Sequence, residues 1–212
     1  MSKDNTSVVI CCAGMGTRLG IGTTKALMHI DGKPLIIHQL EALKSFNDIR
    51  IVVGYQAERV IEVVNEYRKD IMFAFNNDYK KTGPAASLSK GVIQAREYLL
   101  YVEGDILVNP DDFKKILSIN GEFLAISKKH STEPTLVYVD SEEAKFFSKD
   151  GNYEWTGIAR IATKKLVNGF KYTYEVIEKA LPIPAVMIRS RDIDTPEDYE
   201  RALEWVHNGY KN

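Results

Sequence analysis

A glycine-rich loop with two cations follows the first apolar run of the chain. Residues 8–12 form a short apolar segment typical of a buried strand, and the chain then breaks at Ala13 into this loop. The loop residues concerned are Gly14, Gly16, Arg18, Gly20, Gly22 and Lys25. Small residues let successive backbone N–H groups turn inward as a nest for an anion, and basic side chains add positive charge. The pattern therefore indicates a site for a polyphosphate.

Two better-known phosphate motifs do not fit this loop. A dinucleotide fingerprint requires a third glycine where this chain has Leu19, and an ATPase P-loop requires a Gly-Lys-Ser/Thr sequence that the loop lacks. From the residues alone, two interpretations remain open: an anion-binding nest, or a flexible surface loop with solvated basic side chains.

A carboxylate follows a later apolar run. Residues 98–102 predict a strand, and Glu103-Gly104-Asp105 comes directly after it. Ligands of open α/β sheets bind beyond the carboxyl ends of strands, and Mg²⁺ prefers one or two protein carboxylates together with phosphate oxygens and water. Asp105 is therefore a candidate metal ligand, and a turn aspartate bonded to its own backbone is the structural alternative. Glu103 is placed to line a base or ribose pocket, or to lie beside the metal.

The run Tyr153-Glu154-Trp155 places a carboxylate between two aromatic rings. Such a group could bind a quaternary or protonated amine through cation–π attraction and one fixed negative charge. A tryptophan in a strand that follows a turn is also a common core residue. The run therefore predicts either an amine-binding box or a part of the core.

The elements that must position these residues alternate between strand and helix patterns. This alternation predicts an α/β fold with a parallel-rich sheet covered on both faces. The predicted strands are residues 8–12, 49–53, 71–75, 98–102, 123–127, 135–139 and 184–188. The predicted helices are residues 34–43, 57–67, 85–98, 109–119 and 196–207, with one or two more in 162–181. Residues 149–152 carry a hairpin-turn signal. The charged groups of residues 128–134 could touch a bound ligand, but a solvated loop is the preferred interpretation.

Length and composition are those of a single domain spanning residues 1–212. The net charge of -1 gives no broad basic surface, so neither nucleic acid nor a membrane is an expected partner. Cys11 and Cys12 are adjacent in a predicted strand, so their side chains point to opposite faces and form no ordinary disulfide. The first residues lack an apolar signal segment, and a reducing, cytoplasmic location is expected. Whether an apolar helix face mediates a homodimer is left open.

Three short runs resemble a known family. A-G-x-G-T-R-L, T-K-A-L and G-K-P-L-I, in residues 13–36, look like the signature of the nucleotidyltransferases that make sugar-nucleotides and CDP-alcohols. The resemblance implies their GT-A-like, Rossmann-like fold, which is a three-layer α/β sandwich with a mostly parallel mixed central sheet. It also implies that Arg18 and Lys25 are catalytic: the arginine holds the NTP phosphates, and the lysine neutralises the α-phosphate as it is attacked. Thr24 stands where the family often has proline, which affects loop rigidity more than chemistry.

The same resemblance implies a set of nucleotide-binding residues. The expected residues are Ala13, Gly14, Met15, Gly16, Thr17, Arg18, Gly83, Ala86, Ser87 and Glu103. In the family, the segment that corresponds to residues 80–91 lies against the nucleotide base. From the residues alone, that segment could also be a plain loop-to-helix junction capped by Thr82 or Ser87.

Residues 192–198, D-I-D-T-P-E-D, resemble the family's C-terminal metal element, and Asp105 matches its strand-end aspartate. The two aspartates of this element alternate in direction if extended, so only one can face the metal bound to Asp105. Members of the family use either position, so both Asp192 and Asp194 are kept, with Asp194 preferred. The implied cofactor is Mg²⁺. The four histidines are scattered, and their spacing predicts no metal site.

The run E-W-T-G-I at residues 154–158 resembles the bacterial phosphocholine cytidylyltransferase branch of this family. The expected reaction is Mg²⁺-dependent transfer of CMP from CTP to a small phosphorylated amine alcohol or phosphonate, with Tyr153, Glu154 and Trp155 at the acceptor. One alternative is transfer from UTP, GTP or dTTP to a sugar 1-phosphate, and another is a catalytically silent nucleotide-binding module. A glycosyltransferase that uses Asp192-Ile193-Asp194 is a more remote alternative, because this motif lies near the C-terminus.

Overall fold

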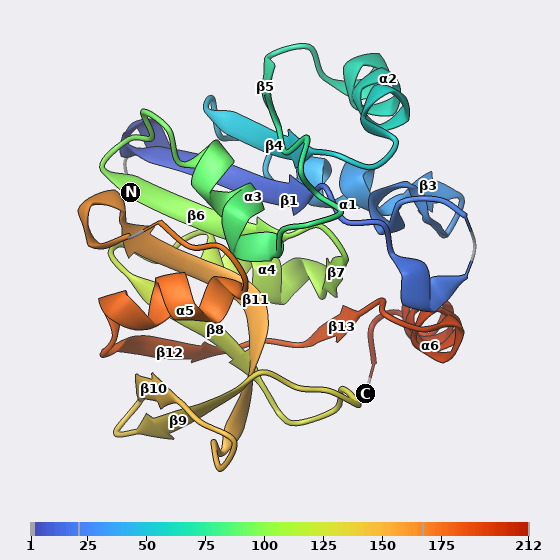
Figure 1. Ribbon diagram of the computed structural model, residues 1–212. Helices are drawn as coiled ribbons and strands as arrows, with labels where there is room; N and C mark the ends of the chain where they lie inside the picture. The colour runs from blue at the N-terminus through green and yellow to red at the C-terminus, as the bar shows by residue number, and fades with distance from the viewer. Residues whose placement is uncertain (1–2, 21, 167, 212) are drawn as a thin grey trace.

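The computed structural model describes residues 3–20, 22–166 and 168–211, which are built around one mixed sheet (Figure 1). In spatial order its strands are β5 (Ile71–Phe75), β4 (Ile49–Val53), β1 (Thr6–Cys12), β6 (Tyr98–Glu103), β11 (Tyr153–Ala162), β8 (Phe123–Ser127), β12 (Ile183–Met187), β10 (Glu143–Phe147) and β9 (Leu136–Asp140). β1 lies between β4 and β6 and is parallel to both. The glycine-rich loop that follows β1 therefore emerges at the edge where β4 and β6 also end.

Parallel pairing is confined to two parts of the sheet. β5, β4, β1 and β6 run parallel to one another, as do β8 and β12, whereas β11 is antiparallel to β6 and β8. The predicted α/β fold with a mixed sheet is confirmed. The second half is more antiparallel than the strand and helix alternation predicts, because strands buried on both faces show the same apolar runs in either direction.

Helices cover both faces of the sheet (Figure 1). One face carries α1 (Leu35–Ala42), α2 (Ala57–Tyr67) and α4 (Pro110–Ile116), and the other carries α3 (Pro84–Gly91) and α5 (Thr173–Ile177). Short 3-10 turns occur at η1 (Lys3–Asn5), η2 (Thr17–Leu19), η3 (Lys25–Leu27), η4 (Thr163–Lys165) and η5 (Glu178–Ala180). The layers are therefore helix, sheet and helix, as the sandwich architecture requires.

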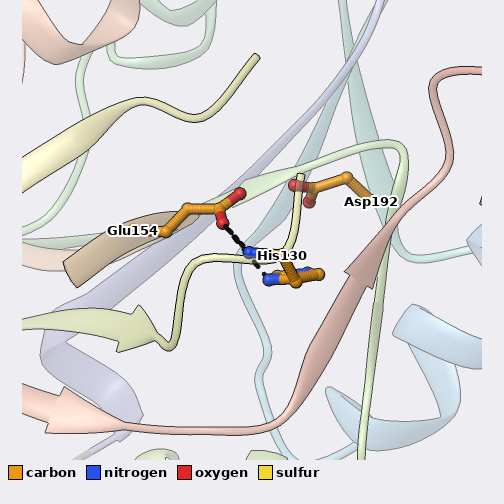
Figure 2. A group of neighbouring side chains, drawn as sticks. All are labelled: His130, Glu154 and Asp192. Atoms are coloured by element: carbon orange, nitrogen blue, oxygen red, sulfur yellow. Dashed lines mark hydrogen bonds and ion pairs between the residues drawn. The ribbon is translucent and has the colours of Figure 1, made fainter. Parts of the chain in front are cut away.

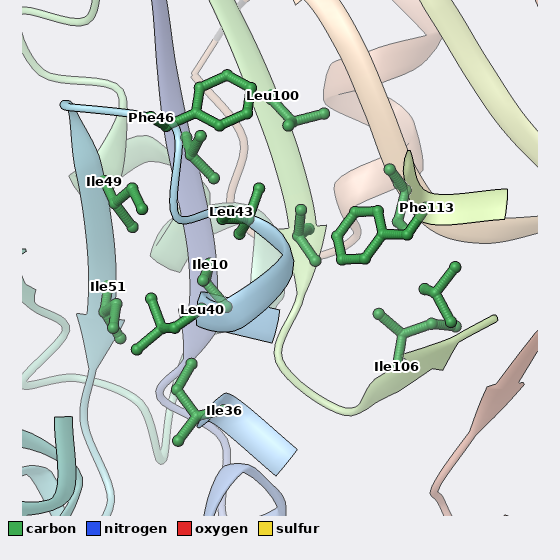
Figure 3. Close-up of a cluster of buried hydrophobic side chains, with 14 of the residues drawn as sticks. Ile10, Ile36, Leu40, Leu43, Phe46, Ile49, Ile51, Leu100, Ile106 and Phe113 are labelled. Atoms are coloured by element: carbon green, nitrogen blue, oxygen red, sulfur yellow. The ribbon is translucent and has the colours of Figure 1, made fainter. Parts of the chain in front are cut away.

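Each face of the sheet has its own apolar core. Because successive side chains of a strand point to opposite faces, Ile10 of β1 joins the core under α1, and the neighbouring Val9 joins the core under α3. Figure 3 shows the first core, where Ile36 and Leu40 of α1 lie close to Ile10 and Ile51 of the sheet. Full burial of such a side chain contributes roughly 1.5–3 kcal/mol. These contacts hold the strand ends, and the loops that follow them, in place.

The adjacent cysteines follow the same alternation. Cys12 belongs to the first core, whereas Cys11 packs partly against the second. Both are free thiols, as predicted from their adjacent positions in one strand.

A two-stranded sheet brings the C-terminal aspartates to the end of β6. β13 (Ser190–Asp192) is antiparallel to β7 (Ile106–Val108), which follows Asp105 directly. The backbone N–H of Ile193 then donates to the carbonyl oxygen of Asp105 at 3.1 Å. Residues distant in sequence, Asp105 and the 192–194 segment, therefore meet at one edge. The other two-stranded sheet pairs β2 (His29–Ile30) with β3 (Lys33–Pro34).

The final helix begins as predicted. Thr195 caps α6 (Pro196–His207): its hydroxyl accepts a hydrogen bond from the Asp198 N–H, and the Asp198 carboxylate accepts from the Thr195 N–H. Such a reciprocal capping box satisfies two backbone donors that a helix start leaves unpaired. It fixes the point at which the chain leaves the 192–194 segment.

The helix predicted for residues 85–98 is too long. α3 ends at Gly91, and the chain then turns through Gln94, which has a positive φ of 55°. The buried guanidinium of Arg50 in β4 donates to the carbonyl oxygens of Gly91, Ile93 and Gln94. A distant side chain therefore satisfies the backbone acceptors at the helix end, which local sequence does not reveal.

The hairpin predicted at residues 149–152 is also wrong. That segment joins β10 to β11, but β10 pairs with β9 and β12, whereas β11 pairs with β9, β6 and β8. The tight hairpin turn lies instead between β9 and β10, at Ser141 and Glu142, whose φ angles of 51° and 62° are typical of a type I′ turn.

Residues 162–181 contain less helix than predicted. β11 extends to Ala162, and α5 is short, ending at Ile177 before the turn η5. Within the described ranges, no helix combines the length and the apolarity needed to cross a membrane.

Candidate active site

Two adjoining cavities open at the carboxyl ends of β1 and β6. The larger has a volume of about 370 Å³ and the smaller about 240 Å³. The residues that line both are Cys11, Gly14, Arg18, Lys25, Gly104 and Asp105. The structure therefore brings the glycine-rich loop and the predicted metal ligand together, at the edge where open α/β sheets bind their ligands.

The glycine-rich loop presents free backbone donors. Within the described part of the chain, the N–H groups of Gly14, Met15 and Gly16 donate to no other protein group. Gly16 has the left-handed φ of 58° that lets neighbouring N–H groups converge. Ala13 lines the larger cavity and Thr17 the smaller, whereas Met15 is not among the described residues that line either. The unpaired N–H groups and the left-handed Gly16 are features of an anion nest.

Lys25 lies between two carboxylates where the cavities meet. Its ammonium group donates to Asp105 Oδ2 at 2.8 Å and to Asp194 Oδ1, and its side chain is only 14% exposed. Burial opposes the charge, but the two carboxylates hold the pKa of Lys25 above its ordinary value. A Cβ at Gly16 would lie 3.0 Å from Lys25 Cγ, so glycine leaves room for the lysine stem. Lys25 therefore presents a permanent positive charge to both cavities.

Arg18 bridges the loop and two acidic residues across the mouth of the larger cavity. Its guanidinium donates to Glu133 at 2.9 Å and to Asp194 at 3.0 Å, and its side chain is about half exposed. A guanidinium binds carboxylate and phosphate oxygens with the same planar donor fork. The donors that now meet carboxylates can therefore also meet a phosphate.

Thr24, which stands where the resembled family often has proline, is held by a distant side chain. Its N–H donates to Gln56 Oε1 at 3.3 Å, and the hydroxyl of Thr23 donates to the same oxygen at 3.0 Å. Thr24 itself is buried. Gln56 thus fixes the loop just before Lys25.

The segment before α3 and the first turns of α3 also line the larger cavity. Gly83 and Ser87 are among its lining residues, whereas Ala86 is not among the described residues there. The buried amide of Asn76 donates to Thr82 Oγ1 and to Ser87 Oγ, each at 3.0 Å. A Cβ at Gly83 would lie 1.9 Å from a backbone oxygen of the segment before α5, so only glycine fits this junction. The sequence does not predict Asn76 as a site residue. Its position directly after β5, at the edge of the sheet where ligands bind, is a feature that could have identified it.

Glu103 lies at the end of β6 beside the predicted metal ligand. The Tyr101 hydroxyl donates to its Oε1 at 3.3 Å. Burial, together with the nearby charges of Asp105 and Asp192, raises the pKa of Glu103 to about 8. A Cβ at Gly157, where φ is 73°, would lie 2.3 Å from Glu103 Oε2. Glycine in β11 therefore makes the space that this carboxylate occupies.

A further polar group reaches the lining of the same cavity through Ser131, Glu154 and Asp192. Figure 2 shows His130, Glu154 and Asp192 pointing toward one another. Glu154 Oε2 accepts from the backbone N–H of His130 at 2.9 Å and lies 3.2 Å from its ring Nδ1. The hydroxyl of Ser131 contacts both Glu154 and Asp192, the latter at 2.9 Å. Because a hydroxyl has one hydrogen, Ser131 donates to only one carboxylate at a time.

These contacts set the charges of the group. Burial opposes ionisation of Glu154, but hydrogen bonds from His130 and Ser131 outweigh it and lower the pKa of Glu154 to about 2. The hydrogen bond to Glu154 raises the pKa of His130. Burial and the charge of Asp105 raise the pKa of Asp192 to about 7. Glu154 is therefore ionised at neutral pH and holds the loop that carries His130.

Sequence reasoning missed this group. The histidines were expected to be scattered and residues 128–134 to be solvated, but His130 meets Glu154 and Asp192 within 4.8 Å, and Ser131 and Glu133 line the cavity. No local signal marks such a contact, because it joins a loop, a strand and the segment before the last helix.

The run Tyr153-Glu154-Trp155 does not form an open aromatic box. Glu154 is engaged by the 128–134 loop, and Tyr153 is not among the described residues that line the cavity. Trp155 reaches the lining but is only 6% exposed, stacks on Tyr101 with 6.1 Å between ring centroids, and donates its indole N–H to Ile158. Trp155 is therefore mainly a core residue, the structural alternative foreseen from the sequence.

Two aspartates offer oxygens suited to a divalent cation beside the phosphate loop. Asp105 and Asp194 share the Lys25 ammonium group, whereas Asp192 turns toward Ser131. Carboxylate oxygens are hard donors, and Mg²⁺ uses one or two of them together with phosphate oxygens. The donor set therefore fits Mg²⁺.

Residues 8–147 match the family model of the MobA-like NTP transferase domain. The chain belongs to this family. It is also 36% identical over 101 residues to the bifunctional protein GlmU of Sulfurovum sp. (strain NBC37-1), a match that covers 47% of this chain and 23% of that protein. The chain thus spans less than half the length of the curated relatives that it matches.

Solved structures give the same fold. The CTP:phosphocholine cytidylyltransferase from Streptococcus pneumoniae superposes with a TM-score of 0.78 at 22% identity, covering 95% of this chain and 99% of that one. A UDP-glucose pyrophosphorylase superposes with a TM-score of 0.74 at 17% identity, covering 96% and 98%. Identities this low establish a common fold, and they confirm the predicted α/β fold. The match of residues 8–147 to the family model confirms the predicted superfamily.

Proposed function

We propose that this chain is a nucleotidyltransferase that transfers CMP from CTP to a small phosphorylated amine alcohol or a related phosphonate. The observation that carries the proposal is the position of Lys25, whose ammonium group is held by Asp105 and Asp194 where the two cavities meet. The free N–H groups of the loop lie beside this charge. The fold likeness to a CTP:phosphocholine cytidylyltransferase supports the choice of CTP and of an amine-bearing acceptor.

The proposed reaction needs charge neutralisation rather than a general base. An acceptor phosphate carries nucleophilic oxygens at neutral pH, and one of them attacks the α-phosphorus of the NTP. As this P–O bond forms, the bond from the α-phosphorus to the bridging oxygen breaks, and that oxygen leaves with its electron pair in pyrophosphate. The loop N–H groups and Arg18 orient the leaving phosphates, and Lys25 stabilises the charge that develops at the α-phosphate.

Asp105 would hold Mg²⁺ together with one of the C-terminal aspartates. We assign Asp194 to this role, because Asp194 and Asp105 share the Lys25 ammonium group. When bound, the ion neutralises phosphate charge and fixes the orientation of the phosphate chain. Asp192 remains the alternative ligand.

The nucleotide would lie along the glycine-rich loop with its base toward α3. Gly83 and Ser87 line the larger cavity, and Asn76 donates to Ser87 and to Thr82, which precedes Gly83. Ala86 is proposed as a neighbour of the base because it lies in the same turn of α3 as Ser87. The residues proposed to bind the nucleotide are Ala13, Gly14, Met15, Gly16, Thr17, Arg18, Gly83, Ala86, Ser87 and Glu103.

A sugar 1-phosphate is the second candidate acceptor. The fold likeness to a UDP-glucose pyrophosphorylase favours this candidate, and UTP, GTP or dTTP would then replace CTP. A silent nucleotide-binding module would need neither the buried lysine nor the paired carboxylates. A cytoplasmic location and a homodimer stay predictions.

The proposal is tested by pyrophosphate release. The purified chain is assayed in Mg²⁺ with each of CTP, UTP, GTP, ATP and dTTP, crossed with phosphorylated amines, aminoethylphosphonate and sugar 1-phosphates. We expect release with CTP and an amine-bearing acceptor, and none when either substrate is left out. Pyrophosphate release only with sugar 1-phosphates would favour the second candidate, a sugar-1-phosphate nucleotidyltransferase. Tight NTP binding without pyrophosphate release would favour the silent module.

A further inference from the structure

One end of the larger cavity is left for the acceptor once the nucleotide is placed as proposed. The glycine-rich loop takes the phosphates and residues 76–87 take the base, which leaves the end formed by β6, β11, β13 and residues 128–134. Its lining residues are Tyr101, Glu103, Ser131, Glu133, Thr135, Glu154, Trp155, Asp192 and Asp194. The charged side chains in this set are carboxylates, and the cations Arg18 and Lys25 of the same cavity contact two of them, Glu133 and Asp194. The acceptor end is therefore acidic.

Three of these five carboxylates already have basic partners. Glu133 and Asp194 pair with Arg18, and Glu154 lies 3.2 Å from the ring nitrogen of His130. Their charge is therefore compensated within the protein.

The other two carboxylates lack such compensation. Among the described residues, Glu103 and Asp192 have no ion pair within 4.0 Å, although a ring nitrogen of His130 lies within 4.8 Å of an Asp192 oxygen. Glu103 contacts only the hydroxyl of Tyr101, at 3.3 Å, and Asp192 contacts the hydroxyl of Ser131, at 2.9 Å. Both side chains are half-buried in the cavity, where a carboxylate is costly without a cation or a set of N–H donors. These two can accept hydrogen bonds from a positively charged group of the acceptor.

The aromatic rings at this end are closed to a cation. Tyr101 and Trp155 are 1% and 6% exposed and stack on each other, and the ring of Phe147 meets Trp155 edge-on at 5.6 Å. Recognition of a quaternary ammonium depends on exposed aromatic faces, because that group has no N–H to donate. The cavity end therefore offers hydrogen-bond acceptors rather than ring faces.

We infer that the acceptor carries a primary ammonium group, held by N–H hydrogen bonds to Glu103 and Asp192, rather than a trimethylammonium group. This inference rests on the proposed function and assigns Asp105 and Asp194 to the metal. The acceptor is then of the ethanolamine phosphate or aminoethylphosphonate type. Its phosphate faces Lys25, and its ammonium group lies deeper in the cavity.

The test is an N-methylation series. Pyrophosphate release from CTP is measured with phosphoethanolamine and with its mono-, di- and trimethylated forms, the last being phosphocholine. The neutral analogue 2-hydroxyethyl phosphate is included. We expect kcat/KM to fall with each methyl group and to be at least about tenfold lower for phosphocholine and for the neutral analogue, as for lost charge-assisted hydrogen bonds elsewhere.

Matched variants locate the effect. Glu103→Gln and Asp192→Asn should each lower the ratio of kcat/KM for phosphoethanolamine to that for 2-hydroxyethyl phosphate. The change should come mainly from a higher KM for phosphoethanolamine. Glu133→Gln changes a carboxylate of the same cavity that is already paired with Arg18, so it should leave that preference unchanged. Circular dichroism and thermal melting establish that each variant is folded.

The outcomes separate this inference from the proposed function. Equal or higher kcat/KM for phosphocholine would overturn the inference and leave CMP transfer standing. A flat series, with no response to Glu103→Gln or Asp192→Asn, would assign these carboxylates to another cation such as a second Mg²⁺. Release only with sugar 1-phosphates, or with no acceptor at all, would overturn both.

Discussion

The side-chain amide of Gln39 in α1 donates to the backbone carbonyl of Glu103 at 2.8 Å and to that of Ile106 at 3.0 Å. These two carbonyls flank Gly104 and Asp105. Gln39 is only 3% exposed, so the helix on one face of the sheet holds the turn that carries the proposed metal ligand. One glutamine thus connects the first core to the active site.

Replacing Gln39 by methionine should loosen this turn. Two buried carbonyls lose their donors, so we expect the free energy of unfolding to fall by about 2 kcal/mol. The Mg²⁺ concentration for half-maximal pyrophosphate release should also rise several-fold, because Asp105 is less firmly placed. Denaturant titration and a Mg²⁺ titration measure the two effects. Glu41→Gln, which changes a partly exposed residue of the same helix, is the control. If Gln39→Met leaves the Mg²⁺ requirement unchanged, Gln39 stabilises the fold without positioning Asp105.

Lys25→Met should remove the main electrostatic stabiliser of the proposed transition state. We expect turnover to fall on the order of 10²-fold or more. Without the ammonium group, Asp105 and Asp194 face each other, so Mg²⁺ should raise the melting temperature of the variant more than that of the parent protein. Lys33→Met, which changes a lysine paired with Glu41 outside the cavities, serves as the control. Unchanged turnover would contradict the catalytic assignment.

The two C-terminal aspartates should respond differently to substitution. Asp105→Asn and Asp194→Asn should each raise the Mg²⁺ concentration for half-maximal activity by about tenfold or more, as for lost metal ligands. Asp192→Asn should act mainly on KM for the acceptor. The measurement is a Mg²⁺ titration of pyrophosphate release at saturating CTP. The opposite result, with Asp192→Asn the more sensitive to Mg²⁺, would exchange the two roles.

Glu154→Gln should change stability in a pH-dependent way. Burial opposes its ionisation, but hydrogen bonds from His130 and Ser131 lower the pKa of Glu154 from 4.5 to about 2. Its stabilising effect is therefore fully present above pH 4.5 and is lost as the pH falls toward 2. We expect Glu154→Gln to be less stable by on the order of 2 kcal/mol at pH 6 and the difference to shrink below pH 4. Urea titrations across this range test it, with exposed Glu62→Gln as control.

At higher pH, the stabilisation that Glu154 provides decreases because its partner His130 loses its charge. The hydrogen bond to Glu154 raises the pKa of His130 above 6.5, so its charge stabilises the fold below that value and is lost as the pH rises through the raised pKa. The stability difference between Glu154→Gln and the parent protein should therefore be largest near pH 5 to 6. A difference that is constant from pH 3 to pH 9 would contradict the charge pairing.

Gly157→Ala should displace Glu103. The added Cβ would lie 2.3 Å from Glu103 Oε2, and the φ of 73° also disfavours any side chain. We expect a loss of about 1–3 kcal/mol in the free energy of unfolding and a higher KM for the acceptor. Gly209→Ala is a matched control, because its φ is 65° but its surroundings are open. Equal effects of the two changes would show that backbone strain alone accounts for the loss.

Several elements could be predicted from local sequence. The strands at residues 49–53 and 71–75 and the helix at 57–67 lie where the apolar patterns predict them. The helix predicted from residue 196 begins there, at the capping box of Thr195 and Asp198. Such features depend on neighbours within a few residues, since side-chain periodicity and capping act along a single element.

Other features could not be predicted in this way. α3 ends early, where Arg50 of β4 binds the carbonyls of Gly91 and of the turn that follows it. The segment at 149–152 joins two strands that do not pair with each other. The loop at 128–134 contributes Ser131 and Glu133 to the cavity because Glu154 binds its backbone. Each of these outcomes depends on contacts between residues that are far apart in the chain.

The sequence by itself determined the chemical groups of the site: a glycine loop able to turn its N–H groups inward, a lysine, an arginine and strand-end carboxylates. Only the tertiary structure decided their grouping. It places Asp194 with Asp105 on Lys25, turns Asp192 toward Ser131, and buries Trp155 in the core. The physical reason is that backbone conformation and residue type are local properties. Which carboxylate meets which cation depends instead on the packing of distant strands and loops.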